Sequence, residues 1–495
     1  MAPLTIGVVG AGTMGRGIAQ LAAQAGIAVL LLDTAPGAVE AAREAITADA
    51  DKLASRGRLS PERAAAVAGL VRPAATLLDL APCGLVVEAI VEDLAVKQAL
   101  FQALEGVLTP EAVLATNTSS LSVAALAAVC QRPQRVAGLH FFNPVPLMKL
   151  VEIIEGPATS PEVIAFLTAL TRQFGHQPVA AKDMPGFIVN HAGRAYGPEA
   201  LRIVSEGVAE FATVDAIMRD AAGFRMGPFE LFDLIGLDVS RRVMQSIYDQ
   251  FHQEPRFRPV PLVAQRVAAG LLGRKSGKGF VTSPASPAPV AAKPDRPVWV
   301  SGAEPEMASP LIAALEKAGV VVEHGSEPSP QAVILLTPLG EDTTSAVLRL
   351  GLDPARTLSV DMLFPEARRY TLMPSPATSE PWGASALAAL AATGQPVSLI
   401  HDGTGFVAQR IVAQIVSIGC EIAQQRIATP ADIDLAVRLG LGYPHGPFAL
   451  GDRIGPRRVL RILQAMHAAT GDPCYRPSAW LRRRAMLGLP LAAPD

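Results

Sequence analysis

Short apolar runs alternate with segments of helical periodicity from Thr5 to Val179. The apolar runs are rich in Val, Ile and Leu, as expected of parallel strands that are buried on both faces. The segments between them, such as residues 14–25 and 96–104, have apolar positions spaced as on one face of a helix. This alternation predicts a doubly wound α/β sheet. The expected strands are residues 5–10, 28–33, 84–90 and 112–118.

The pattern changes after DMPGF at residues 183–187, where a mainly helical region begins and continues to Phe280. Residues 282–297 are rich in Pro, Ala and Ser and lack amphipathic periodicity, which predicts an extended, semi-stiff linker. Strand-like runs return beyond the linker, and a second helical block begins at Gly405. The expected later strands are residues 298–302, 319–325 and 332–337.

The two halves of the chain are related in sequence. DMPGFIVN at residues 183–190 reappears as DGTGFVAQ at 402–409, and GPFELFDLIG at 227–236 reappears as GPFALGDRIG at 446–455. Both matches have the same offset of 219 residues, which favours an internal duplication over a chance resemblance of glycine-rich turns. The expected domains are a Rossmann-type α/β domain (1–184), an all-α domain (185–281), the linker (282–297), a degenerate Rossmann-like domain (298–400) and a second all-α domain (401–495).

The second copy lacks the polar residues that mark the first. VWVSGAEPE stands where the first half has IGVVGAGTMG, without its glycine spacing. Alignment of the two halves puts Asp361 opposite His140, Thr371 opposite Glu152 and Gln409 opposite Asn190. If the first copy is catalytic, the second is a structural or regulatory relic.

Composition excludes several classes of protein. The 495 residues carry a formal net charge of −2, so no global basic field attracts nucleic acid or an anionic membrane. The four cysteines are scattered without CxxC spacing, which argues against a disulfide framework or a metal site. The N-terminus shows no leader, and no apolar run approaches the roughly eighteen residues that cross a bilayer. We therefore expect a cytoplasmic protein.

A glycine-rich turn follows the first expected strand. VVGAGTMGRGIAQ places Gly10, Gly12 and Gly15 in GxGxxG spacing at a helix start, where Thr13 and Met14 complete the turn and free N–H groups would meet a pyrophosphate. Asp33, at the end of the next strand, would accept hydrogen bonds from ribose hydroxyls and repel a 2′-phosphate. The motif predicts bound NAD rather than NADP; the alternative is a glycine turn without a ligand.

A histidine and a glutamate stand twelve residues apart in GLHFFNPVPLMKLVEII. A neutral imidazole at His140 is suited to accept the hydroxyl proton that must leave when a carbinol carbon loses hydride. Glu152 would fix the tautomer of that ring, and the spacing accommodates a strand, a turn and a return strand. The alternative is a structural histidine, which the upstream cofactor motif disfavours.

Other polar residues are candidates for substrate binding. Residues 115–122, ATNTSSLS, follow a strand and would lie at the carboxyl edge of the sheet, although they would also serve as a helix N-cap. Asn190 lies among apolar helical residues and needs a polar partner. Lys52 and Arg56 share one helical face, which suits either a phosphate-bearing substrate or a solvated basic surface.

Together these residues resemble the 3-hydroxyacyl-CoA dehydrogenase family over nearly all of the first half. The resemblance implies NAD-dependent interconversion of an L-3-hydroxyacyl-CoA and the 3-oxoacyl-CoA. Two departures are His191, where the family usually has arginine, and Val281, where it usually has an aromatic residue. The motifs that carry the resemblance are GAGTMGRGIA, VVEAIVEDLAVKQALF, TNTSSLS, GLHFFNPVPLMKLVEII, DMPGFIVN, GPFELFDLIG and GRKSGKGF.

The resemblance also implies roles for individual residues. His140 matches the catalytic base and Glu152 its carboxylate partner, while Ser119 and Asn190 match positions that contact the substrate, Ser119 being also near the cofactor. Lys52 and Arg56 align with basic positions that meet the CoA moiety. The residues expected near the nicotinamide end of the cofactor are Glu92, Lys97, Asn143 and Lys275.

The long, duplicated form resembles dehydrogenases of 3-hydroxybutyryl-CoA and 3-hydroxyadipyl-CoA, which implies a place in fatty-acid β-oxidation or phenylacetate breakdown. We expect the second helical copy to pack on the first and to give a dimer-like core within one chain. The chain is then expected to be a pseudo-dimeric monomer, and a homodimer is the alternative. Two alternatives stay open: a sugar-acid dehydrogenase of the L-gulonate type, and a non-enzymatic NAD-binding protein.

Overall fold

The computed structural model describes residues 3–280 and 294–494. Most of the expected linker, as well as Val281, lies outside the described residues. The chain forms two compact units, one of Met1–His191 with Gln425–Gly442 and the other of Ala192–Gln424 with Tyr443–Asp495. A segment of the second copy thus belongs to the unit that contains the first sheet, an arrangement not anticipated by the expected boundaries, which stay predictions.

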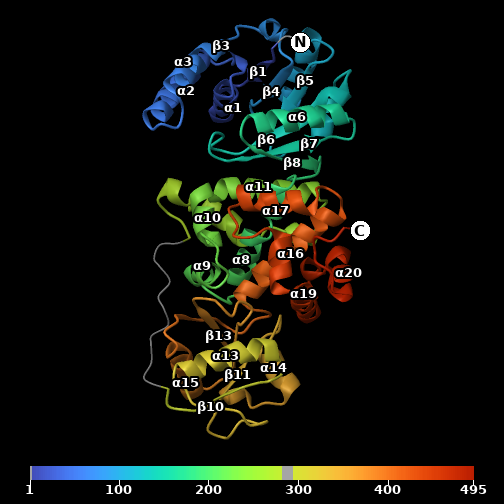
Figure 1. The fold of residues 1–495 in the computed structure, drawn as a ribbon. Coiled ribbons are helices and arrows are strands. Elements are labelled where there is room, and N and C mark those ends of the chain that lie inside the picture. The colour runs from blue at the N-terminus through green and yellow to red at the C-terminus, as the bar shows by residue number, and fades with distance from the viewer. Residues whose placement is uncertain (1–2, 281–293, 495) are drawn as a thin grey trace. The chain divides into compact units, whose positions relative to one another are not determined.

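The first unit is built on an eight-stranded sheet (Figure 1). All neighbouring strands are parallel except for the antiparallel pair β6 and β7. Buried Val, Ile and Leu side chains fill these strands, so the alternation seen in the sequence correctly predicts the α/β fold. In spatial order the strands are β3 (Val71–Pro73), β2 (Ala28–Leu32), β1 (Thr5–Val9), β4 (Leu85–Glu88), β5 (Val113–Thr116), β6 (Val136–Phe141), β7 (Leu150–Glu155) and β8 (Gln177–Lys182).

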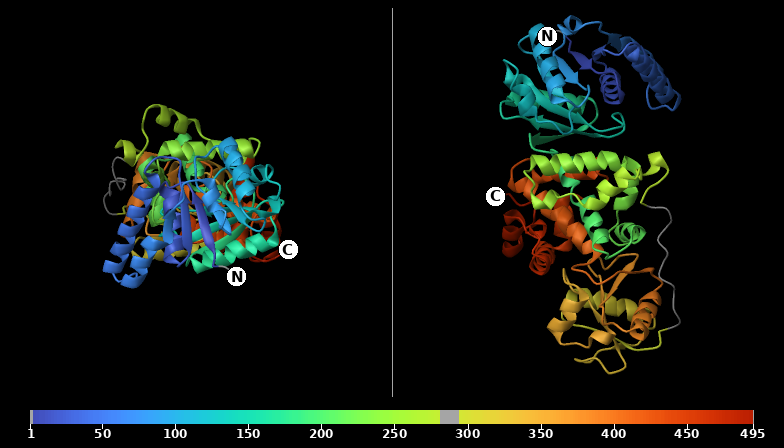
Figure 2. Two further views of the ribbon diagram at one scale, coloured as in Figure 1. Left: turned by 90° about the horizontal axis from the view of Figure 1, so that it is seen from above. Right: turned by 180° about the vertical axis from the view of Figure 1, so that it is seen from behind.

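Helices cover this sheet and extend beyond its edge. α2 and α3 pack against each other as a hairpin beside β3, and this hairpin projects from the sheet in Figure 1 and, seen from above, in Figure 2. α6 packs against β6, β7 and β8. The helices of residues 1–192 are α1 (Thr13–Gln24), α2 (Ala38–Ser55), α3 (Pro61–Leu70), α4 (Leu94–Val107), α5 (Val123–Ala127), α6 (Pro161–Gln173) and α7 (Val189–Ala192), with 3₁₀ turns η1 (Leu77–Leu80) and η2 (Pro133–Arg135).

The last helix of the first unit comes from the second copy. α17 (Pro430–Gly440) packs against β7 and β8, and the backbone N–H of Lys182 donates to the carbonyl of Ile427 at 2.8 Å. The edge strand β8 is therefore covered by a segment about 250 residues away in sequence, which shields an otherwise unpaired sheet edge.

The second unit contains a six-stranded sheet and a helical layer. β12 and β13 form its one antiparallel pair among the described strands. The strands in spatial order are β10 (Val322–Glu323), β9 (Val298–Val300), β11 (Val333–Leu336), β12 (Thr357–Val360), β13 (Tyr370–Pro374) and β14 (Val397–Leu399). The helices are α8 (Tyr196–Ser205), α9 (Phe211–Asp220), α10 (Pro228–Ile235), α11 (Leu237–Gln250), α12 (Pro261–Ala268), α13 (Pro305–Lys317), α14 (Thr343–Leu350), α15 (Glu380–Ala391), α16 (Val407–Gln424), α18 (Pro447–Ile454), α19 (Pro456–Thr470) and α20 (Ala479–Leu487), with 3₁₀ turns η3 (Pro255–Phe257), η4 (Arg274–Ser276), η5 (Pro354–Arg356) and η6 (Pro473–Tyr475).

The same backbone hydrogen bond occurs at equivalent positions in the two units. In the second unit the N–H of His401 donates to the carbonyl of Val208 at 2.9 Å, and these residues lie 219 positions from Lys182 and Ile427 respectively. At the end of each edge strand the backbone is thus hydrogen-bonded to the helical domain of the other copy. Also in the second unit, α16 packs against α8 and α9, so the helical copies pack together as expected from the sequence.

Candidate functional site

The glycine-rich turn lies between β1 and α1 in the first unit. Gly10 has φ of +105°, and a Cβ on Gly15 would overlap the carbonyl oxygen of Gly10, so both positions require glycine. A Cβ on Gly12 would meet nothing within 4 Å, which leaves the backbone open to a ligand. α1 begins without a side-chain cap or an acidic residue in its first turn, so the N–H groups at Thr13 and Met14 can receive an anion.

Asp33 closes the turn from the end of β2. Its Oδ2 accepts from the N–H of Ala11 at 2.6 Å and its Oδ1 accepts from the N–H of Ala35 at 2.8 Å. These bonds hold the carboxylate beside the glycine turn, where a dinucleotide-binding sheet presents its ribose acceptor. The turn, the open Gly12 backbone and the placed carboxylate fit an adenine dinucleotide.

His140 and Glu152 meet through the antiparallel register of β6 and β7. The two residues are direct partners in the ladder, so their side chains share one face of the sheet. Nδ1 of His140 lies 2.7 Å from Oε2 of Glu152, and both side chains are buried. The Phe142 and Phe187 rings lie 4.5 and 5.8 Å from the imidazole, between ring centroids. With Nδ1 held by the carboxylate, Nε2 is the ring nitrogen that the expected role as a base would use, and this role stays a prediction.

A strained turn fixes the other oxygen of Glu152. Phe187 has φ of +49°, a left-handed conformation that bulky residues rarely adopt and that costs on the order of 1 kcal/mol or more. The turn directs two successive backbone N–H groups, of Ile188 and Val189, to Oε1 of Glu152, each at 2.9 Å. Glu152 is thus held on both oxygens, and the carboxylate cannot rotate without losing these bonds.

The polar cluster after β5 divides into two parts. Ser122 caps α5 by accepting from the N–H of Ala125, so the helix-cap interpretation holds for this residue. The Nδ2 group of Asn190 approaches the carbonyl of Ser119 at 3.5 Å, which brings together the two residues expected to bind substrate. Their roles stay predictions.

Glu92 organises the loop that carries Ser119. Its Oε1 accepts from the hydroxyl of Thr118 at 2.5 Å and from the N–H of Ser119 at 3.2 Å. Its Oε2 lies 3.2 Å from Nζ of Lys97. Partial burial raises the pKa of Glu92, but the hydrogen bond from Thr118 and the charge of Lys97 outweigh it, so the pKa lies below its ordinary value. Glu92 therefore stays ionised near neutral pH and keeps the loop in place.

Lys97 is buried against a second acid that sequence reasoning missed. Its ammonium lies 2.5 Å from Oε1 of Glu88, and both side chains are about 1% exposed. Glu88 also accepts from the hydroxyl of Thr116 at 2.7 Å. The signal in the sequence was an acid at the carboxyl end of an apolar strand, where charges are uncommon unless paired. Lys97 thus supports the loop through Glu88 and Glu92, and its approach to a cofactor stays a prediction.

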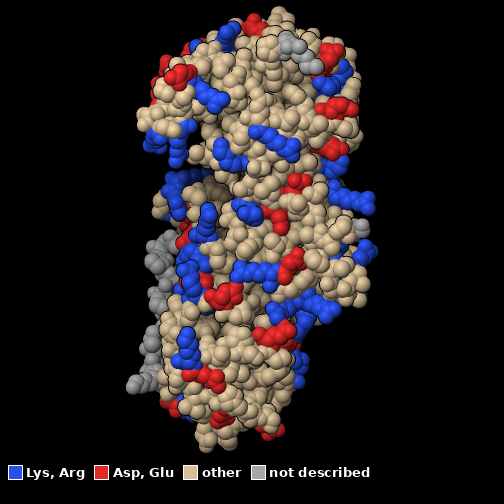
Figure 3. Space-filling model, viewed as in Figure 1, with Lys and Arg blue, Asp and Glu red and all other residues tan. Residues whose placement is uncertain are grey.

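The basic residues of the α2–α3 hairpin line a pocket of about 270 Å³ in the first unit. Lys52 and Arg56 contribute to it, together with Asn143 of the segment after β6. Figure 3 shows Lys and Arg side chains gathered over the tip of this hairpin. Two further cations, Arg16 and Arg58, also line the pocket and were not among the expected site residues.

Arg16 could have been found from helical periodicity. Thr13, Arg16, Gly17 and Gln20 all line the pocket and follow i, i+3, i+4, i+7 spacing, which is one face of α1. The same helix thus carries the glycine-rich turn at its N-terminus and lines the pocket with one side.

Lys275 is the last of the residues expected near the cofactor. It belongs to η4 in the second unit and forms an ion pair with Asp238 in the first turn of α11. Its expected proximity to the cofactor stays a prediction.

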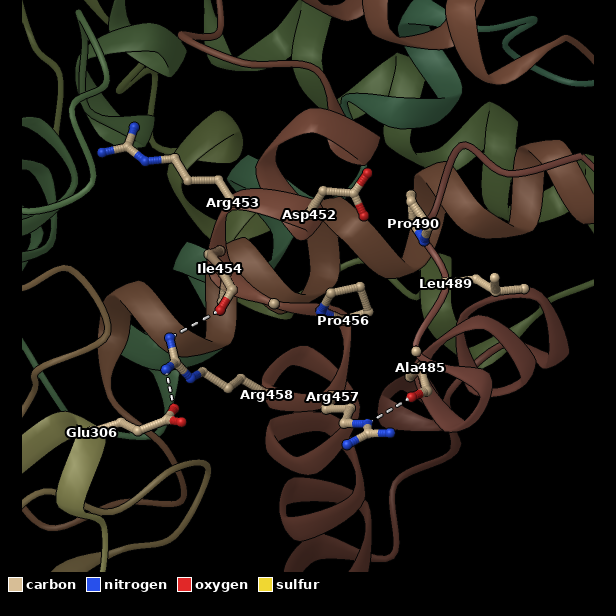
Figure 4. Close-up of a pocket in the computed structure, with 12 residues that line it drawn as sticks. Glu306, Asp452, Arg453, Ile454, Pro456, Arg457, Arg458, Ala485, Leu489 and Pro490 are labelled. Carbon is tan, nitrogen blue, oxygen red and sulfur yellow. Dashed lines mark hydrogen bonds and ion pairs between the residues drawn. The ribbon is translucent and has the colours of Figure 1, made fainter.

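A pocket of about 650 Å³ in the second unit contains none of the expected site residues. Three of the residues that line it are arginines, and Figure 4 shows their side chains pointing in different directions. Arg458 donates to the carbonyl of Ile454 and pairs with Glu306, while Arg457 donates to the carbonyl of Ala485. Because the guanidinium groups do not converge, we assign no ligand to this pocket.

The described residues also limit other chemistry. No group of three or more potential metal ligands occurs among them, and none of their helices is both long and apolar enough for a bilayer crossing. All four cysteines lie among these residues, are buried and form no disulfide. Burial raises the pKa of Cys83 to about 11, and the same effect, with the nearby charge of Glu105, raises that of Cys130 to about 11. Neither thiol is therefore an effective nucleophile at neutral pH.

A dinucleotide turn at the carboxyl edge of the sheet, with a buried histidine held by a carboxylate in the same unit, defines a nicotinamide-dependent dehydrogenase. Comparison with known proteins gives the family. The family model described as "3-hydroxyacyl-CoA dehydrogenase, NAD binding domain" matches residues 5–184. The one described as "3-hydroxyacyl-CoA dehydrogenase, C-terminal domain" matches twice, at 186–283 and 405–490, which confirms the duplication of the helical domain.

Relatives of both lengths agree. The chain is 38% identical over 486 residues to the 3-hydroxyadipyl-CoA dehydrogenase of Escherichia coli strain K12, which spans 98% of each chain. It is 42% identical over 279 residues to a probable 3-hydroxybutyryl-CoA dehydrogenase of Deinococcus radiodurans, covering 56% of this chain and 99% of the relative. The solved structure of a 3-hydroxybutyryl-CoA dehydrogenase from Escherichia coli K12 superposes with a TM-score of 0.88 at 36% identity, covering 98% of this chain and 99% of the other. The chain belongs to the 3-hydroxyacyl-CoA dehydrogenase family, and its cofactor is NAD.

Proposed function

We propose that the chain interconverts a short-chain or dicarboxylic L-3-hydroxyacyl-CoA, such as 3-hydroxybutyryl-CoA or 3-hydroxyadipyl-CoA, with the 3-oxoacyl-CoA. The observation that carries the catalytic assignment is the His140–Glu152 pair, set at 2.7 Å by direct strand pairing within the unit that bears the glycine turn. The full-length match to a 3-hydroxyadipyl-CoA dehydrogenase supports the substrate class.

In this proposal His140 is the general base of the oxidation. Its Nε2 takes the proton from the 3-hydroxyl group, and Glu152 stabilises the imidazolium that forms, through the bond at Nδ1. In the reverse reaction the imidazolium returns this proton. When bound, NAD supplies the acceptor for the hydride that leaves the carbon bearing this hydroxyl group. The buried, phenylalanine-lined surroundings of His140 would keep water from the reacting atoms.

Ser119 and Asn190 complete the proposed substrate site. Asn190 approaches the carbonyl of Ser119, so the Ser119 hydroxyl and the Asn190 side chain would lie together and orient the substrate oxygen toward His140. Glu92 and Lys97 would hold the loop that presents Ser119.

The basic pocket is the proposed site for the phosphates of CoA. Four cations, Arg16, Lys52, Arg56 and Arg58, line it with the single acid Asp49. Such an excess of positive charge suits a polyanion, and the pocket adjoins α1, which follows the cofactor turn.

We also propose that the chain is a pseudo-dimeric monomer in the cytoplasm. The packing of α16 on α8 and the repeated sheet-edge hydrogen bonds support the first part, since each copy already has its partner within the chain. Light scattering on the purified protein tests this, and a stable homodimer would contradict it. Cell fractionation tests the location.

The deciding experiment is NADH oxidation with acetoacetyl-CoA, compared with free acetoacetate and a keto sugar acid. Rapid oxidation with the thioester alone is expected, and relative kcat/KM for the acetoacetyl and 3-oxoadipyl thioesters then identifies the preferred chain. Oxidation of the sugar acid alone would favour a dehydrogenase of the L-gulonate type. Tight NADH binding without turnover of any substrate would favour a non-enzymatic role.

A further inference from the structure

The unit that contains His140 and Glu152 also includes a segment of the second copy. None of the residues proposed for catalysis lies in this segment. Residues 425–442 pack with residues 1–191 as one compact unit, and α17 within this segment contacts β7, the strand that carries Glu152. The contact is close at the final residue of α17, Gly440.

Gly440 lies directly against Val189 and Leu150. A Cβ at position 440 would lie 2.8 and 3.0 Å from the two Cγ atoms of Val189 and 3.1 Å from Cδ2 of Leu150. Gly440 has no positive φ, so the backbone itself would accept alanine, and a helix would favour it. The closeness of these side chains is therefore the reason that glycine is needed.

Val189 and Leu150, the two residues that lie against Gly440, are each connected to Glu152. The N–H of Val189 donates to Oε1 of Glu152 at 2.9 Å. Leu150 lies two residues before Glu152 on the same strand and therefore on the same face of the sheet. A displacement of Val189 by a few tenths of an ångström would be passed to the carboxylate and from there to His140.

We propose that Gly440 is a positioning residue for the reaction and that the second copy sets the geometry of the His140–Glu152 pair through it. The proposal rests on the catalytic assignment made above. In this arrangement α17 supports the turn at Val189 from behind, and the missing side chain at position 440 sets how far that turn lies from β7. The second copy, which has lost its own site, thereby supports the site of the first.

The duplicated sequence offers an internal comparison. The residues 219 positions from Gly440 and Val189 are Ala221 and Ala408. The pair of Val189 and Gly440 therefore corresponds to the pair of Ala408 and Ala221. Where one member of a pair has the larger side chain of valine, the other has none, and where one is alanine, so is the other. This is expected if the two side chains of each pair fill the same space.

The test measures kcat, KM and NADH affinity of Gly440→Ala in the full chain with acetoacetyl-CoA. We expect kcat to fall about tenfold or more, since small misplacements of catalytic groups have such effects. KM for the thioester and the Kd for NADH should stay within about twofold of wild type, because the atoms nearest to a Cβ at position 440 belong to Val189 and Leu150, neither of which is a proposed binding residue.

Rescue and control variants separate positioning from general destabilisation. Val189→Ala in the Gly440→Ala background removes both crowded Cγ atoms and should restore most of kcat. Gly403→Ala is the matched control, because its Cβ would lie 2.7 Å from Cγ2 of Val208 in the second unit, a comparable crowding away from the catalytic sheet. This control should keep wild-type kcat.

The proposal is overturned if Gly440→Ala keeps wild-type kcat, if Gly403→Ala loses as much, or if Val189→Ala gives no rescue. Should Gly440→Ala fail to fold, Val189→Ile crowds the same contact from the other side and should give the same loss of kcat. His140→Gln in the same assay distinguishes the two levels of inference. Its retention of turnover would overturn the proposed function, whereas its loss alongside normal turnover in Gly440→Ala would overturn only the positioning role.

Discussion

In the first copy His140 on β6 lies opposite Glu152 on β7, and in the second copy Asp361 lies opposite Thr371 on β13 in the same antiparallel pairing. The N–H of Asp361 donates to the carbonyl of Thr371 at 3.0 Å, which places Asp361 one step beyond the end of β12. The strand register therefore survives in the second copy, although neither of the two side chains proposed for catalysis is kept there.

The hydrogen bonds around this position also survive in altered form. Gln409 donates to the carbonyl of Pro338 at 3.1 Å, just as Asn190 approaches the carbonyl of Ser119. Both donors and both acceptors are separated by the same offset of 219 residues between the copies. Gln409 donates in addition to Oδ1 of Asp361 at 3.0 Å. The polar groups of the second site thus satisfy one another, while in the first site the proposed arrangement leaves Nε2 of His140 for the substrate. The backbone frame alone does not define an active site; the polar atoms left for the substrate do.

The largest expected difference between the copies is catalytic. His140→Gln should lower kcat by about 10²–10⁴-fold, the range for loss of a general base, while NADH binding is retained. Steady-state kinetics and NADH fluorescence titration measure the two effects. The matched variant at the corresponding position, Asp361→Asn, should leave kcat unchanged. Equal losses in both variants would mean that the second copy also takes part in catalysis.

A second difference concerns the residue after Asn190 and its counterpart after Gln409. The first copy has His191, whereas the second has Arg410, which is about 2% exposed and lies 2.8 Å from Glu199. Arg410 also contacts Glu206 and the hydroxyl of Tyr475. It therefore joins α16 of the second copy to α8 of the first.

Replacing Arg410 by alanine should destabilise the second unit by about 3 kcal/mol, because it leaves Glu199 buried with fewer partners. All three tryptophans, Trp299, Trp382 and Trp480, lie in this unit, so urea unfolding followed by tryptophan fluorescence reports on it selectively. Arg461→Ala, which removes an exposed partner of Glu304, is the control and should lose less than about 1 kcal/mol. Similar losses in the two variants would contradict a special role for Arg410.

The sequence is sufficient to predict the α/β and helical layers and the His140–Glu152 contact. Apolar strands and helix periodicity are local signals, and a spacing of twelve residues suits a strand pair joined by a turn. The placement of α17 was not predictable in this way. Its partners β7 and β8 lie hundreds of residues earlier, and no local pattern in residues 430–440 specifies which of two related sheets they cover.

The candidate site shows the same limit. The glycine turn and Asp33 could be predicted because each is defined by its distance from a strand end. The pairing of Lys97 with Glu88, by contrast, depends on the burial of two opposite charges on neighbouring elements, which requires the packed structure. Arg16 falls between these cases, since its helical face was readable but the pocket beside it was not.

The buried acid of the second copy gives a pH-dependent prediction. Burial raises the pKa of Asp361 to about 6, although the bonds from Gln409 and the N–H of Leu363 oppose this. The folded state therefore binds a proton more tightly than the unfolded chain, and stability falls as pH rises from about 4 to about 6. Asp361→Asn keeps an acceptor for both donors and removes the charge.

We expect Asp361→Asn to raise the free energy of unfolding of the second unit by about 2–3 kcal/mol at pH 7.5 and by much less at pH 4.5. Tryptophan-monitored urea unfolding at the two pH values measures this. A gain that is the same at both values would show that titration of Asp361 is not its source.

The smallest predicted effect concerns a feature that the second copy has lost. Between β10 and β11 it has only the loop of residues 324–332, where the first copy has the α2–α3 hairpin with Lys52 and Arg56. If this hairpin holds the CoA phosphates, Lys52→Ala should raise KM for acetoacetyl-CoA about three- to tenfold and leave kcat within about twofold, since an exposed charged contact contributes roughly 1 kcal/mol.

The increase in KM caused by Lys52→Ala should shrink at high ionic strength because salt screens exposed charges. It should also vanish with acetoacetyl-N-acetylcysteamine, a thioester without phosphates. Arg72→Ala removes an exposed charge from the same unit outside the pocket and should change neither KM. An equal rise in KM for both thioesters on loss of Lys52 would place its effect on the acyl group and leave the phosphate site to be sought elsewhere.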